Sequence, residues 1–101
     1  MIAACMYLQG NDEIFWPDYP AGEALYIHKL AVARPFAGLG LSAMMLDWAA
    51  QQAVHAGRQY LRLDCAPRAK LLTNYHDAGF SRVGGDIVVE GYSAARLQRS
   101  I

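Results

Sequence analysis

The sequence has 101 residues, of which 54% are hydrophobic and 18% are charged. A chain this apolar can bury a core, so its composition predicts one folded domain spanning residues 1–101 and excludes general disorder. Nine basic residues balance nine acidic ones, so no net field favours binding to nucleic acid or to an anionic membrane.

The two cysteines and the first residues indicate the cellular compartment. Cys5 and Cys65 are far apart in the sequence and form no CxxC motif, as is typical of reduced thiols. Residues 1–6 are apolar, but they lack a leading positive charge and are too short to cross a membrane. We therefore predict a cytoplasmic protein with neither nucleic acid nor membrane as a partner.

The first third of the sequence predicts strands separated by turns. Residues 2–8 are apolar and precede a turn signal at 9–12, residues 13–16 are compatible with a short strand, and residues 17–22 form a loop. Residues 24–33 are apolar on both faces, as in a central strand covered on two sides. Strict alternation assigns one face of this strand to four side chains: Tyr26, His28, Leu30 and Val32.

The rest of the sequence predicts helices alternating with strands. A helix over 41–56 ends at Gly57, a strand covers 60–65, and a helix runs from Pro67 to 78–79. Residues 83–90 and 93–98 are two closing strands around a turn at Gly91. The first helix is assigned an apolar side made of Leu41, Met44, Met45, Trp48, Ala49, Gln52 and Ala53. This order predicts a mixed α/β fold with a central βαβ unit.

A glycine-containing segment, residues 36–42, connects the central strand to the first helix. Free N–H groups at a helix start attract anions, and glycines let a phosphate approach the backbone. The functional interpretation of the segment is a pyrophosphate site, and the alternative is an ordinary tight connection, because a lone GxG motif is weak evidence by itself. It lacks the GxGxxG spacing of dinucleotide folds and the GK[ST] of P-loop proteins.

Five segments in order resemble the GCN5-related N-acetyltransferase (GNAT) superfamily over roughly the C-terminal three quarters of the chain. They are LYIHKLAV (25–32), AGLGLS (37–42), LDWA (46–49), LRLDC (61–65) and NYHDAGF (74–80). The resemblance implies a mixed, mostly antiparallel α/β sheet that binds acetyl-CoA as co-substrate and acetylates a small-molecule or peptide amine.

The resemblance also implies roles for individual residues. The main chain of Leu30 and Val32 would pair with pantetheine, and Tyr75 would protonate the departing thiolate. The pyrophosphate would be held by the amides of Gly38, Leu39, Gly40, Leu41 and Ser42. For Tyr75 the alternative is a core tyrosine whose hydroxyl is satisfied by the protein.

The sequence departs from the family pattern within the loop. Ala37 stands where the family usually has Arg or Gln, and Ser42 where it has Gly or Ala. Arg34 or Arg68 could replace the missing charge, and Arg68 stands where the family often has an Asn near the cofactor arm. We assign Arg68 to the cofactor site, the alternative being a solvated surface charge.

The family normally begins with a strand, two helices and another strand before the segment at 2–8, and none of these is present in the sequence. Either the chain is truncated or divergent, or a second chain supplies the missing cover. A sheet without these elements exposes an edge and an apolar face. We therefore predict a homodimer.

His28 is the candidate base, because histidine titrates near neutral pH and an amine must lose a proton to attack. Strict alternation of side chains along the strand assigns His28 to the cofactor side with Leu30 and Val32. The alternative is a histidine packed in the core. Three scattered histidines and two scattered cysteines predict no metal site. Four carboxylates near the loops could attract a cationic amine, although loop acids usually serve solubility: Asp12, Glu13, Asp18 and Glu23.

Neither Ser42 nor Cys65 has the nearby histidine and acid that a nucleophile needs, so direct attack by the amine is favoured over an acyl-enzyme. The rival hypothesis is a degenerate domain that binds CoA weakly or serves only for dimerisation.

Overall fold

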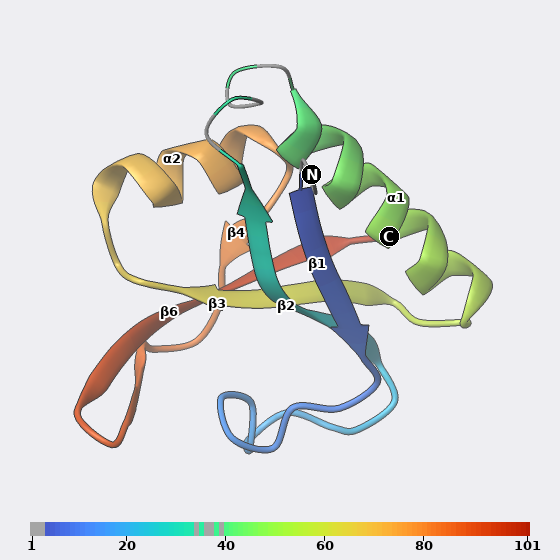
Figure 1. Cartoon of the computed structure of the whole chain (residues 1–101). Helices are drawn as coiled ribbons and strands as arrows, with labels where there is room; N and C mark the ends of the chain where they lie inside the picture. Colours follow the sequence, from blue (N-terminus) through green and yellow to red (C-terminus); the bar gives the residue numbers. More distant parts are fainter. Residues whose placement is uncertain (1–3, 34, 36–37, 39) are drawn as a thin grey trace.

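A six-stranded sheet carries the described helices in the computed structural model, which describes residues 4–33, 35, 38 and 40–101 (Figure 1). In chain order the elements are β1 (Ala4–Gln9), β2 (Ala24–Val32), α1 (Leu41–His55), β3 (Tyr60–Cys65), α2 (Ala69–Asp77), β4 (Ser81–Arg82), β5 (Ile87–Val89) and β6 (Tyr92–Ser100). The strand order is β1-β2-β3-β6-β4, with β5 also paired to β6. β2 and β3 are parallel and the other pairs are antiparallel. The predicted mixed α/β sheet with a central βαβ unit is confirmed.

Two predicted strands are corrected. Residues 13–16 form a turn, in which Asp12 Oδ1 accepts the N–H groups of Ile14 and Phe15. The predicted strand at 83–90 is interrupted at Gly84, whose φ is 59°. A Cβ there would lie 2.9 Å from the Tyr19 hydroxyl oxygen, so the chain leaves the ladder at a position that only glycine fits.

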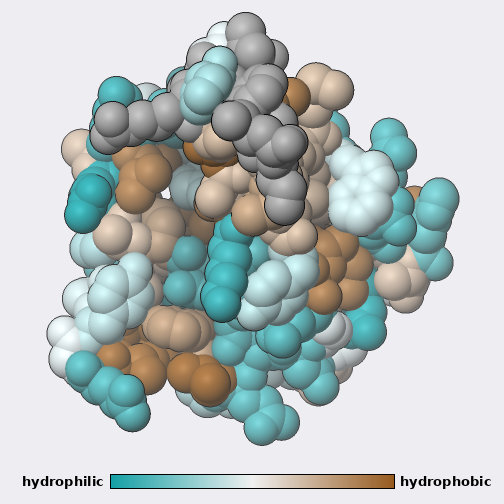
Figure 2. Space-filling model, in the orientation of Figure 1, coloured by the Kyte–Doolittle hydropathy of each residue, from teal (hydrophilic) through white to brown (hydrophobic). Residues whose placement is uncertain are grey.

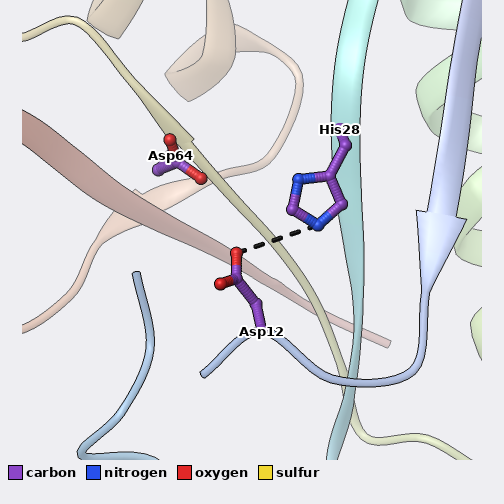
Figure 3. Close-up of side chains that lie close together, drawn as sticks. All are labelled: Asp12, His28 and Asp64. Carbon is purple, nitrogen blue, oxygen red and sulfur yellow. Dashed lines mark ion pairs between the residues drawn. The ribbon is translucent and has the colours of Figure 1, made fainter. Parts of the chain in front are cut away.

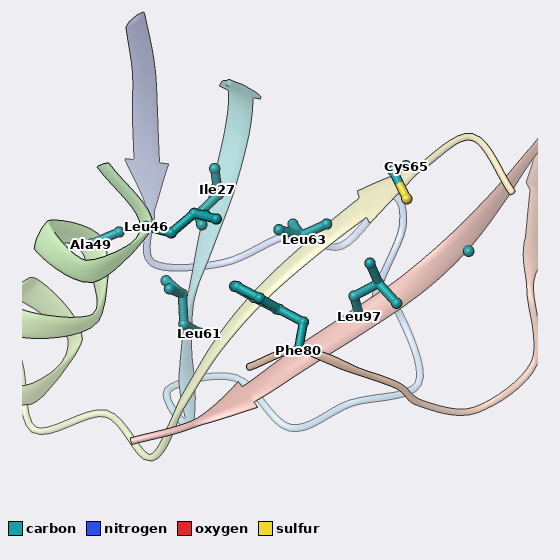
Figure 4. Packing of buried hydrophobic residues seen from close by; sticks show 9 residues of the cluster. Ile27, Leu46, Ala49, Leu61, Leu63, Cys65, Phe80 and Leu97 are labelled. Carbon is teal, nitrogen blue, oxygen red and sulfur yellow. The ribbon is translucent and has the colours of Figure 1, made fainter. Parts of the chain in front are cut away.

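The larger core lies between the sheet and the two helices (Figure 4). Its buried members are Ile27, Leu46, Ala49, Leu61, Leu63, Cys65, Phe80, Ala95 and Leu97. The side chains of β3 alternate as predicted, with Leu61, Leu63 and Cys65 on this face. α2 contributes partly buried residues such as Leu72 and Tyr75. No helix within the described ranges is long and apolar enough to cross a membrane.

The predicted apolar side of α1 is partly wrong. The buried residues of α1 are Leu46, Ala49 and Ala53, whereas Met44 is 65% exposed and Trp48 is 51% exposed. This helix is apolar on several sides, so its periodicity could not select the side that faces the sheet.

The opposite face of the sheet carries an aromatic layer that encloses two arginines. Arg62 is 1% exposed and its guanidinium lies 4.7–5.9 Å from four ring centroids, those of Trp16, Tyr19, Tyr26 and Tyr60. Arg96, 5% exposed, lies beside two of these rings and binds Asp18 at 2.6 Å. Buried charge is stable here because both guanidinium groups lie over aromatic rings and donate to oxygen acceptors.

Candidate functional site

β2 and β3 diverge along their length and so open the sheet. Their register is paired from Ala24 with Tyr60 to Tyr26 with Arg62, while β2 continues to Val32 and β3 to Cys65. β2 also contains a bulge opposite β1, where the register shifts between Cys5 and Tyr7. Lys29 at this bulge has a φ of 54°, which is unusual for a residue with a side chain.

The bulge changes which β2 side chains share a face. Leu30 packs against the helix-side core together with Ile27, although the two are three residues apart and strict alternation would separate them. His28 lies on the other face, beside Asp12. The prediction that His28 shares the side of Leu30 and Val32 is therefore wrong, because the bulge inserts one residue into the alternation.

A cleft of about 530 Å³ lies on the helix side, between the end of β2, the start of α1 and α2. Its lining combines apolar side chains with backbone from the glycine segment: Leu30, Val32, Gly38, Gly40, Leu41, Ser42, Ala43, Leu46, Leu71, Asn74, Tyr75, Asp77 and Ala78. An apolar trough with a polar end suits a ligand that has an extended chain and a charged terminus.

The start of α1 supplies the polar end of the cleft. The first intrahelical bond runs from Met44 N–H to Gly40 O, so the N–H groups of Leu41, Ser42 and Ala43 have no acceptor within the helix. Among the described residues, no side chain caps this end and no acidic residue occupies its first turn. Gly40 has a φ of 77°, and no atom of the residues that the structure describes lies within 4 Å of its Cβ position. An anion can therefore approach these amides directly.

Tyr75 lines the same cleft from α2. Its ring packs edge-on against Phe80 at 5.9 Å, and Phe80 is 1% exposed. Burial, together with the nearby Cys65 and Asp64, raises the pKa of Tyr75 above its usual 10.0. Its hydroxyl makes no hydrogen bond with any side chain or backbone group in the described ranges, so it remains free to donate a proton to a molecule in the cleft.

Three titratable residues meet on the opposite side of the β2–β3 opening: Asp12 after β1, His28 on β2 and Asp64 on β3 (Figure 3). The Nε2 atom of His28 lies 3.8 Å from Oδ2 of Asp12, and the His28 ring stacks on Tyr7 at 5.4 Å. Burial, and secondly the negative charge of Asp12, raises the pKa of Asp64, while His28 acts in the opposite direction. Sequence spacing gave no signal for this group, because its members come from three distant segments.

The cleft thus collects seven of the residues assigned to the site from the sequence: Leu30, Val32, Gly38, Gly40, Leu41, Ser42 and Tyr75. Leu39, Ala37 and Arg34 lie outside the described residues. Arg68 is exposed at the N-cap of α2 and is not among the residues that line the cleft. Sequence reasoning missed Asn74 and Asp77; the position of Asn74 beside Tyr75 in the NYHDAGF segment was the available signal.

The cysteines differ in their surroundings. Cys65 is buried, and desolvation together with the neighbouring Asp64 charge raises the pKa of its thiol. A thiol held in this state is a poor nucleophile. Cys5 is exposed and free.

Comparisons with known proteins show which family the sequence is similar to. The sequence profile of the Acetyltransferase (GNAT) family matches residues 2–80. A curated relative, the uncharacterized N-acetyltransferase YesJ of Bacillus subtilis (strain 168), is 37% identical over 76 residues, which cover 74% of this chain and 42% of that protein.

Solved structures share the fold. A GNAT family acetyltransferase from Listeria monocytogenes 4b F2365 has a TM-score of 0.74 and 25% identity, over 100% of this chain and 59% of its own. A GNAT family acetyltransferase from Elizabethkingia anophelis, solved with acetyl-CoA bound, has a TM-score of 0.75 and 18% identity, over 100% of this chain and 70% of its own. The chain therefore spans less than half of the curated relative and somewhat more than half of these structures.

Proposed function

Since the chain belongs to the Acetyltransferase (GNAT) family, we propose that it transfers an acetyl group from acetyl-CoA to a primary amine. The observation that carries this proposal is one cleft that joins the free amides at the start of α1 to the Tyr75 side chain. The cleft offers an anion site at one end, which suits the CoA pyrophosphate, and a proton donor on its wall, which suits the thiolate that leaves when an amine attacks the acetyl-CoA thioester.

In this proposal the pyrophosphate binds at Gly38, Gly40, Leu41 and Ser42, together with Leu39. The pantetheine arm follows the diverging end of β2, where Leu30 and Val32 offer backbone groups that β3 does not pair. Arg68, at the N-cap of α2, adds positive charge near the cofactor. Acetyl-CoA supplies the activated acyl group, and the protein orients it, since orientation removes much of the entropic barrier.

The acceptor amine approaches through the opening between β2 and β3 from the face that carries His28. His28 takes the proton of the attacking amine on Nε2, and the stack of its ring on Tyr7 holds the imidazole in place. The amine attacks the thioester carbon directly; a tetrahedral intermediate forms, and the C–S bond breaks as Tyr75 donates its proton to sulfur. Buried Cys65 with its raised pKa supports this route over an acyl-cysteine.

The pyrophosphate site is tested by Gly40→Ala. Both Gly40, with φ 77°, and Gly57, with φ 70°, have open space at the Cβ position, so an alanine costs similar backbone strain at each. Only the Gly40 methyl would stand between the α1 amides and a phosphate. We expect Gly40→Ala to weaken acetyl-CoA binding about tenfold, the loss of roughly one charge-assisted hydrogen bond, as measured by calorimetry. Gly57→Ala should bind like the parent.

Equal affinities for the two variants would exclude the glycine segment as the phosphate site. An assay for released thiol over a panel of amines then separates the enzyme from its rival: saturable acetyl-CoA binding without turnover of any amine would favour a non-catalytic CoA-binding domain.

We also propose that the chain forms a homodimer through the β1 edge. β1 is the end strand of the described sheet, and a groove of about 720 Å³ beside it is lined by Ala4, Cys5, Met6, Leu41, Met44, Met45 and Trp48. Figure 2 shows hydrophobic surface in this area of β1 and α1. An unpaired edge next to apolar surface favours association.

The dimer predicts that Trp48→Lys yields monomers by light scattering at micromolar concentration, because the charge enters the apolar groove. Val54→Lys is the matched control, since Val54 is 56% exposed on the same helix but outside the groove. A monomeric parent protein would contradict the proposal.

A further inference from the structure

Asp12, His28 and Asp64 bring together three metal-binding side chains on the face opposite the cleft (Figure 3). One ligand atom from each residue lies within 4.8 Å of the others, and all three residues are partly shielded from solvent. An imidazole with two carboxylates is a ligand set for a divalent transition metal rather than for Mg²⁺ or Ca²⁺, which favour oxygen ligands alone.

Asp12 provides the observation that points to a bound ion. Its side chain is 5% exposed. Its Oδ1 accepts the N–H groups of Ile14 at 3.1 Å and Phe15 at 3.0 Å, which fixes the carboxylate. Its Oδ2 is buried, points at His28, and has no hydrogen-bond partner among the described residues. Buried carboxylate oxygens are normally satisfied, so this one needs a partner.

His28 also has a buried polar atom without a hydrogen-bond partner among the described residues. Its Nε2 is buried and without a partner among the residues that the structure describes. The 3.8 Å separation from Asp12 Oδ2 is too long for a hydrogen bond. Zinc binds imidazole nitrogen and carboxylate oxygen at about 2.0–2.2 Å, so one ion can touch both atoms if they are less than about 4.3 Å apart. The 3.8 Å separation between Asp12 and His28 meets this condition. The ligand atom of Asp64 lies within 4.8 Å of the other two, so a side-chain shift of a few tenths of an ångström brings it to the same ion.

We propose that Asp12 Oδ2, His28 Nε2 and a carboxylate oxygen of Asp64 bind one Zn²⁺ ion. Two carboxylates and a neutral imidazole carry a charge of −2, which a divalent ion balances. The stack of His28 on Tyr7 and the two backbone donors to Asp12 hold these ligands in place, as outer contacts do in metal sites.

Zinc at this site inhibits acetyl transfer, a consequence that rests on the proposed function. The ion and the proton of the amine compete for the same lone pair on His28 Nε2. The CoA cleft lies on the other face of the sheet, so zinc leaves acetyl-CoA affinity unchanged.

The binding test titrates Zn²⁺ into chelator-treated protein by calorimetry. We expect one ion per chain, with affinity reduced about 100-fold in Asp12→Asn and in His28→Gln. His55→Gln and His76→Gln, at exposed helix positions, and Cys5→Ser should bind like the parent. Asparagine at 12 keeps the oxygen that accepts the two backbone N–H groups, and unchanged circular dichroism and acetyl-CoA affinity would show that each variant is folded.

Absent or non-stoichiometric binding overturns the proposal, as does binding that survives in Asp12→Asn and His28→Gln or that is lost in Cys5→Ser. Inhibition is measured separately as acetylated product. If zinc binds at Asp12, His28 and Asp64 but no amine is acetylated, the zinc site is supported and the proposed acetyltransferase activity is rejected. Turnover that is insensitive to saturating zinc would reject the competition at His28.

Discussion

Tyr75→Phe is expected to lower kcat about 100-fold at saturating acetyl-CoA while leaving acetyl-CoA affinity close to that of the parent. General acid catalysis typically contributes about 10²–10⁴-fold, and the phenylalanine ring preserves the packing against Phe80. The hydroxyl makes no hydrogen bond within the described ranges, so its removal should cost little stability. Thiol release and calorimetry on the same preparation separate the two effects.

Tyr60→Phe is the matched control, because Tyr60 is half-buried in the aromatic layer on the other face of the sheet. It should retain parental turnover. Equal kcat values for Tyr75→Phe and the parent would exclude Tyr75 as the acid.

The pH dependence of turnover also tests the assignment of Tyr75 as the general acid. Burial raises the pKa of Tyr75 above 10.0, so the hydroxyl keeps its proton until the pH exceeds that value. The parent should therefore show no alkaline loss of activity from this group below about pH 10. An alkaline fall centred near pH 8 that disappears in Tyr75→Phe would contradict the raised pKa.

Arg62→Ala is expected to destabilise the protein by about 3–5 kcal/mol, the cost of breaking a buried ion pair from one side. Arg62 donates to Glu23, to the Tyr26 hydroxyl at 3.1 Å and to Gln98 at 2.8 Å. Its removal leaves these acceptors unpaired and opens a void among four aromatic rings. The loss is a large share of the about 5–15 kcal/mol that stabilises a typical domain. Urea denaturation measures it.

Arg82→Ala is the control, because Arg82 is 48% exposed and pairs with Asp86 on the surface. Exposed pairs contribute about 0–1 kcal/mol. If Arg62→Ala does not fold, Arg62→Lys provides the measurement. Lysine keeps the charge but not the planar fork, so it should still lose about 1–3 kcal/mol. Losses at Arg62 no larger than at Arg82 would show that the aromatic layer is not the stabilising feature.

Much of the fold could be predicted because it depends on local signals. Strand β3 was predicted with its bounds and its two faces, since Leu61, Leu63 and Cys65 alternate without interruption. Gly57 ended α1 with a positive φ of 70°, as expected for a residue just past a helix end. The glycine segment and the NYHDAGF segment led to a group of residues that the structure collects in one cleft.

The wrong predictions share one cause: they depend on tertiary pairing and packing, which the local sequence pattern does not contain. Only the pairing of β1 with β2 creates the bulge at Lys29 that moves His28 to the other face. Only the sheet selects Leu46, Ala49 and Ala53 as the buried side of a helix that is apolar on several sides.

The sequence by itself determined most of the order of elements, the family and the identity of the CoA-side candidates, because periodicity, turn residues and short motifs act over a few neighbouring positions. The tertiary structure alone decided which face each candidate occupies and that Asp12, His28 and Asp64 meet. Proximity between such distant residues arises from strand pairing and packing across the whole chain, and residue spacing carries no trace of it.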